Sequence, residues 1–141
     1  MRPCAEVVTF LWRSKGSPVV EAENPFTDVD EDDFYYNAVL WAVSKGITTG
    51  TSETTFSPFK TCTRAETVTF LWRAQGAPNV TSDTVEFTDV DEDDFFATAV
   101  YWAARLQVTN GMTETTFGPY VVCNRAHIVT FLYRMRDFDI R

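Results

Sequence analysis

Apolar residues recur at helical spacing in two kinds of segment along the chain. In the first kind, Phe34, Ala38, Trp41 and Ala42 follow one another at i, i+4, i+7 and i+8. This stripe predicts a short amphipathic helix that ends before Gly46.

The second kind of segment has a clearer beginning and end. Residues 63–66, Thr-Arg-Ala-Glu, are typical of a capping box, in which Thr63 and Glu66 each bond the other's backbone N–H. An apolar stripe follows from residue 65 to residue 72, and Gly76 and Pro78 are placed to end the helix.

This two-helix pattern is written more than once. Residues 26–73 return as residues 87–134 with 28 of 48 positions identical, and residues 5–15 match residues 65–75. The chain therefore begins on the second half of a repeat, and we interpret residues 1–18 as a half-repeat and residues 26–78 and 87–136 as full repeats. Because each helical hairpin is too short to bury its own stripe, the units are expected to stack in one all-α domain over residues 1–141, with short extended or turn segments.

The opening helix lacks the first half of its own repeat. We therefore expect its apolar stripe to be covered by a partner chain or by a rearrangement of the packing.

The segment before each first helix is polar and acidic. Phe26 and Val29 are expected to anchor an extended stretch, and the carboxylates that follow are expected to cap the helix. The spacing of Asp28, Asp30 and Asp32 is similar to the start of a calcium loop, but the glycine and glutamate that such a loop needs are absent. No metal is predicted, although a weak surface calcium site stays open.

Composition narrows the classes of function. The chain has 20 acidic and 12 basic side chains, a formal net charge of −8, which argues against a nucleic-acid partner. No apolar run is long enough for insertion into a membrane. The amino terminus has no signal-peptide pattern, which leaves either a cytoplasmic protein or a piece of a longer secreted chain.

Neither the cysteines nor the single histidine indicates a disulfide framework, a zinc site or a catalytic group. Cys62 and Cys123 occupy the same repeat position, which disfavours a disulfide framework, and no CxxC spacing suggests zinc. His127 is expected in a helix cap, where it replaces the glutamate of the capping box. No nucleophile is paired with it, so no catalytic residue, cofactor or enzymatic activity is predicted.

Five landmarks occur in order in both full repeats and resemble the S-layer homology (SLH) domain family. In the first repeat they are Phe26-Thr27-Asp28-Val29, Trp41, Gly46-Ile47-Thr48-Thr49-Gly50, Phe56-Ser57-Pro58 and Thr63-Arg64-Ala65-Glu66. In the second they are Phe87-Thr88-Asp89-Val90, Trp102, Gly111, Phe117-Gly118-Pro119 and Asn124-Arg125-Ala126-His127.

The resemblance implies a fold and a function. The fold is three repeats around a pseudo-threefold axis. The function is non-catalytic anchoring of a surface protein outside the cell, by binding a secondary polysaccharide of the bacterial cell wall, often pyruvylated, in grooves between repeats. A guanidinium suits such a carboxylate ligand because it presents a planar fork of donors.

Ligand-binding residues follow from the resemblance by position. The expected set is Arg64, Asp89, Trp102, Arg125, Asp28, Trp41, Gly50 and Gly111. If each arginine faces the Asp and Trp of the next repeat, the first groove has Cys4 in place of an arginine. The second pairs Arg64 with Asp89 and Trp102, and the third leaves Arg125 without a partner repeat. The second groove is thus the one predicted to be complete.

Structural roles compete with these assignments. The arginines are equally suited to tying repeats together through carboxylates, and tryptophans on a helical stripe are more often core than sugar platforms. For the whole domain, the alternative function is recognition of a protein partner or self-association. The missing half-repeat and the loss of an arginine at Cys4 favour that alternative.

Overall fold

The structure, a computed structural model, describes residues 4–78, 87–106, 108–109, 111–113 and 115–135. This part of the chain holds five helices and no strand, which confirms the all-α prediction: α1 (Cys4–Ser14), α2 (Tyr36–Ser44), α3 (Arg64–Ala74), α4 (Ala97–Arg105) and α5 (Arg125–Met135). None of these helices combines the length and apolar character that crossing a membrane would require.

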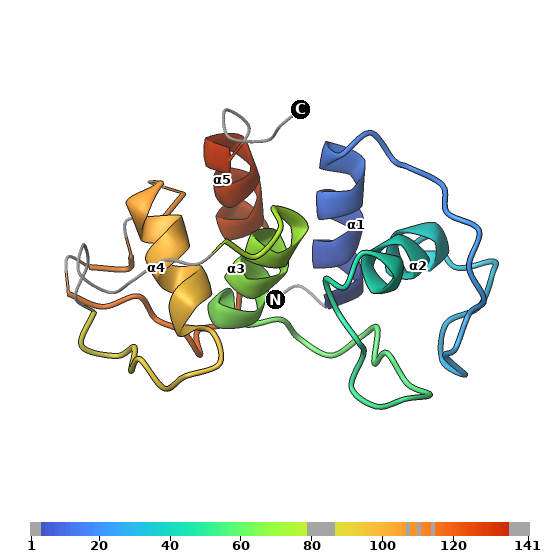
Figure 1. Ribbon diagram of the computed structural model, residues 1–141, viewed down its shortest axis with the longest axis horizontal. Helices are drawn as coiled ribbons and strands as arrows, with labels where there is room; N and C mark the ends of the chain where they lie inside the picture. The colour runs from blue at the N-terminus through green and yellow to red at the C-terminus, as the bar shows by residue number, and fades with distance from the viewer. Residues whose placement is uncertain (1–3, 79–86, 107, 110, 114, 136–141) are drawn as a thin grey trace.

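The second helices of the repeats form the centre of the molecule. Helices α1, α3 and α5 contact one another in all three pairings, while α2 packs on α1 and α4 packs on α3 (Figure 1). The two helices of one repeat therefore do not pack on each other in the described part of the chain. Each first helix packs instead on the second helix of the preceding repeat.

This pairing covers the opening helix from within the chain. Val7, Val8 and Leu11 of α1 are buried, and α2 packs on their helix. The expectation that a partner chain or a rearrangement would be needed is therefore wrong, because the sequence pattern did not show which helix pairs with which.

The last helix, α5, has an exposed apolar face, and this face is covered on α1 and α3. Val129 of α5 is 51% exposed, whereas the equivalent Val8 and Val68 are fully buried, and Tyr133 is 63% exposed. No described helix lies against α5 in the way that α2 lies against α1 and α4 against α3.

The first helices begin later than their apolar stripe predicts. Helix α2 begins at Tyr36, and Phe34 is 60% exposed while its neighbour Tyr35 is buried. The reason is a turn in which the Asp33 carboxylate accepts the backbone N–H of Asp30 at 2.8 Å. The acidic residues therefore close a turn rather than cap the helix, and the N-cap residue Tyr35 makes no side-chain cap hydrogen bond.

Asp28 and its equivalent Asp89 hold the loop that follows each first helix. The two oxygens of Asp28 accept the backbone N–H groups of Phe56 and Ser57, both at 2.9 Å. Asp89 makes the same pair of bonds in the second repeat, both at 2.8 Å. Phe26 is buried, as its predicted role as an anchor requires.

The caps of the second helices are formed largely as expected. Helix α3 has the complete capping box of Thr63 and Glu66. On α5, Asn124 accepts the N–H of His127 at 2.9 Å, and His127 Nδ1 accepts the N–H of Asn124 at 3.4 Å. The box predicted to be lost there thus persists in a longer form, because an imidazole nitrogen can accept a hydrogen bond as a carboxylate does.

Candidate functional site: two grooves between repeats

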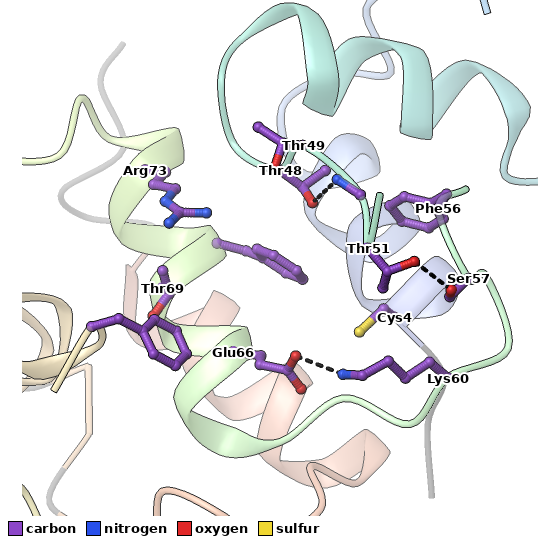
Figure 2. A pocket seen from close by; sticks show the side chains of 13 residues that line it. Cys4, Thr48, Thr49, Thr51, Phe56, Ser57, Lys60, Glu66, Thr69 and Arg73 are labelled. Carbon is purple, nitrogen blue, oxygen red and sulfur yellow. Dashed lines mark hydrogen bonds and ion pairs between the residues drawn. The ribbon is translucent and has the colours of Figure 1, made fainter. Parts of the chain in front are cut away.

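Two grooves lie between the second helices and the loops that follow the first helices. The Cys4 groove has a volume of about 160 Å³ and opens between α1, α3 and the 48–60 segment (Figure 2). It is lined by Cys4, Thr48, Thr49, Gly50, Thr51, Phe56, Ser57, Lys60, Glu66, Thr69, Phe70, Arg73 and Phe95.

The Arg64 groove is the equivalent space in the second repeat. Its volume is about 240 Å³, and it is lined by Arg64, Thr109, Gly111, Met112, Ala126, His127, Thr130, Phe131 and Arg134. All of these residues except Ala126 are the counterparts, 60 or 61 positions later, of residues that line the Cys4 groove. The two spaces are thus the same site with different chemistry.

Arg64 connects two repeats from inside its groove. Its side chain leaves α3, donates from Nε to the Phe117 carbonyl at 3.0 Å and reaches the Thr109 hydroxyl at 3.4 Å. The guanidinium carbon lies 4.8 Å from the ring centroid of Phe117 and 5.2 Å from that of Phe131. Two aromatic rings and a carbonyl therefore hold this cation, which is a stabilising arrangement for a guanidinium.

Burial gives Arg64 a structural role as well as a place in the groove. The residue is only 3% exposed, and burial lowers the pKa of its guanidinium, opposed by the nearby Cys123 and Asp89. Arg64 contacts the second repeat, as the resemblance implied. Its side-chain hydrogen bonds go to Phe117 and Thr109 and not to the Asp89 carboxylate.

The two expected glycines line the grooves, whereas the two expected aspartates do not. Gly50 lines the Cys4 groove and Gly111 the Arg64 groove. Asp28 and Asp89 line neither groove, and they accept backbone N–H groups of the loops that follow the first helices. The side chain of Arg125 lies outside the described part of the structure.

Both tryptophans expected at the ligand are buried. Trp41 and Trp102 are each 4% exposed and line neither groove. Their place in the core follows from the stripe of α2 and α4 that faces α1 and α3. A stacking role for these indoles therefore has no exposed ring face to support it.

Comparison with known proteins identifies the family. The family described as S-layer homology domain matches residues 25–68 and 86–127, more than half of the chain. This chain belongs to the S-layer homology domain family. Domains of this family are surface-anchoring modules, which is the coarse function of the present domain.

A curated relative of this S-layer homology domain is a cell surface protein from Thermoanaerobacter kivui. The two are 29% identical over 121 residues, which is 83% of this chain and 16% of the relative. The chain thus spans about one sixth of the length of the relative it matches.

The S-layer homology domain also exposes aromatic rings that sequence reasoning missed. Phe95 is 67% exposed and lines the Cys4 groove, although it belongs to the second repeat, and Phe59 and Tyr120 are more than 70% exposed. A signal was present in the sequence: two aromatic residues in succession, as at Phe95 and Phe96, cannot both face the core of a helix terminus.

His127 gives this S-layer homology domain a testable pH dependence. Burial first, and then the Arg64 charge, lower the pKa of His127 in the folded protein. The unfolded chain, whose histidine has its ordinary pKa, then binds more protons, so stability is lost as the pH falls through about 6.5. We expect the wild type to lose more unfolding free energy than His127→Gln between pH 7.5 and pH 5.0 in urea titrations. Glutamine can also complete the capping box, and a difference that is the same at both pH values would contradict the expectation.

Proposed function

We propose that the domain anchors its parent protein, outside the cell, by non-catalytic binding of an acidic cell-wall polysaccharide in the Arg64 groove. The observation that carries the proposal is the presence of two guanidinium groups, those of Arg64 and Arg134, around one concavity in a chain whose formal net charge is −8. Two positive charges on an otherwise acidic protein provide a local attraction for an anion.

The rest of the groove suits a sugar that carries a carboxylate. Thr109 and Thr130 supply hydroxyls beside the cations, and Phe131 supplies an apolar floor. Few polar groups converging on an apolar surface are the usual composition of a small-molecule site. A pyruvylated terminal sugar is the ligand we propose, because its carboxylate matches a guanidinium and its ring matches the floor.

The test is co-sedimentation with purified Gram-positive cell-wall sacculi, before and after their secondary polysaccharide is removed. We expect the folded wild type to bind intact sacculi and to lose binding after stripping. Arg134→Gln should weaken binding about tenfold or more, which is the usual effect of losing one charge-assisted hydrogen bond. Its matched control is Arg73→Gln, the equivalent change in the Cys4 groove, which should bind as the wild type does.

Two outcomes would contradict the proposal. Equal weakening by Arg134→Gln and Arg73→Gln would remove the Arg64 groove from the proposal, and failure of the folded wild type to bind any intact sacculi would remove glycan binding itself.

Binding of a protein partner is the second candidate function, and the exposed apolar face of α5 favours it. Val129 is 51% exposed, whereas the equivalent Val8 and Val68 lie on helices that α2 and α4 cover. Sacculus binding that survives stripping and is lost in Val129→Glu would support this role over the glycan.

A further inference from the structure

Two thiols and a carboxylate converge at the inner end of the Cys4 groove. The Sγ atoms of Cys4 and Cys62 and a carboxylate oxygen of Glu66 all lie within 4.8 Å of one another. Cys4 is 6% exposed and Cys62 is fully buried. In Figure 2 the Cys4 sulfur points toward the side of the cavity where Glu66 meets Lys60.

This spacing is close to what a tetrahedral zinc ion needs. With Zn–S distances of about 2.3 Å and Zn–O distances of about 2.0–2.2 Å, neighbouring ligand atoms in a tetrahedron lie roughly 3.5–3.8 Å apart. The three groups therefore need to move together by no more than about 1 Å to share one ion. The adjoining cavity provides room for water at the fourth position and a path for the ion.

The charges around the three groups also favour a cation. Glu66 already attracts one, because Lys60 Nζ lies 2.7 Å from its Oε2. The Lys60 side chain is 46% exposed, so it can turn into solvent when a metal takes its place beside the carboxylate. Cys4 is the first residue of α1, where the helix dipole stabilises negative charge.

The Cys62 thiol is protonated while no metal is bound. A hydrogen bond with Cys4, followed by burial, raises the pKa of Cys62 far above its ordinary value. Metal binding to such a pair releases protons, so its affinity increases with pH.

The Arg64 groove shows why the site is confined to one repeat. At the positions equivalent to Cys4, Cys62 and Glu66 it carries Arg64, Cys123 and His127. A guanidinium there offers no lone pair and repels a metal ion. Replacement of an arginine by Cys4 therefore exchanges a fixed cation for a ligand.

We propose that Cys4, Cys62 and Glu66 form a binding site for one zinc-class divalent ion. The ion would tie the start of α1 to the start of α3, and so join the half-repeat to the first full repeat. The site is independent of glycan binding, because Arg64, His127 and Arg134 take no part in it.

Titration of the reduced, metal-free full chain with Co²⁺ and Zn²⁺ tests the proposal. We expect one equivalent of Co²⁺ to give the absorption of tetrahedral cobalt with thiolate charge transfer, and Zn²⁺ to displace it. Zn²⁺ should also raise the thermal midpoint of the wild type, because an ion that binds only the folded state stabilises it. Cys4→Ser and Cys62→Ser should each lose about a hundredfold or more in affinity, and Glu66→Gln a smaller factor.

Cys123→Ser is the matched control, since it removes a buried thiol in the equivalent position of the other groove. It should bind one equivalent as tightly as the wild type. Circular dichroism establishes folding of each variant, and Cys4→Ala serves where Cys4→Ser does not fold. Three outcomes would each overturn the proposal: absence of stoichiometric binding to the folded, reduced wild type, retention of full affinity in Cys4→Ser or Cys4→Ala, and a Cys4–Cys62 disulfide that reductant opens only on unfolding.

Discussion

Replacement of Arg64 by alanine is expected to lower the unfolding free energy by about 3 kcal/mol, and not only to weaken ligand binding. The truncation removes the hydrogen bond to the Phe117 carbonyl and the packing of the guanidinium between Phe117 and Phe131. It also leaves a buried carbonyl without this donor, which adds the desolvation penalty of that group. Urea denaturation followed by tryptophan fluorescence measures the loss.

Arg64→Lys separates stability from binding. Lysine keeps the charge but cannot supply the planar fork, so we expect about half the loss of stability and a clear loss of glycan affinity. Arg13→Gln, which removes one positive charge from an exposed position on α1, is the control for net charge. A loss below about 1 kcal/mol in Arg64→Ala would show that the repeats do not depend on this contact, since that is the range of an ordinary hydrogen bond.

Gly111→Ala is expected to be at least as damaging as Arg64→Ala, at about 3–4 kcal/mol. Gly111 has φ of +85°, and a Cβ placed there would lie 2.6 Å from the Thr116 carbonyl oxygen and 2.8 Å from the Phe87 ring. A carbonyl fixed in a loop cannot move aside as the end of a long side chain can. The same contacts recur around Gly50, so Gly50→Ala should lose a similar amount.

Gly46→Ala is the matched control for the backbone conformation. Gly46 has φ of +72°, but a Cβ there would meet nothing within 4 Å. Its substitution should therefore cost only the conformational penalty of about 1 kcal/mol. Equal losses at Gly46 and Gly111 would show that the close approach of Phe87 and Thr116 contributes nothing.

Local features were predictable because their causes lie within a few residues. The capping box of Thr63 and Glu66 forms as its spacing indicates. Gly16 follows the end of α1 with φ of +89°, and the indole N–H of Trp12 donates to the Pro18 carbonyl at 2.7 Å, which fixes the path of the chain after the helix. The corresponding bond recurs at the end of α3.

Features that depend on pairing between distant segments were harder to predict. Asp28 was expected at a ligand, but its carboxylate finds loop N–H groups 28 and 29 positions away. Cys4 and Cys62 showed no metal-site spacing in the sequence because 58 positions separate them, and only the contact of α1 with α3 brings their thiols together. Hydrophobic periodicity finds the face of a helix but does not identify the helix that covers it.

The offset between sequence repeat and helix packing changes what counts as a module. The backbone N–H groups of Cys4 and Ala5 bond the carbonyls of Lys60 and Pro58, and those of Arg64 and Ala65 bond the carbonyls of Val121 and Pro119. Residues 4–62 and 63–123 thus each enclose a packed helix pair with its loop. When such repeats are shuffled or grafted, segment boundaries just before α3 and α5 would therefore keep each packed helix pair together. Segment boundaries in the linkers that follow α1 and α3 would instead separate α1 from α2 and α3 from α4, which pack on each other.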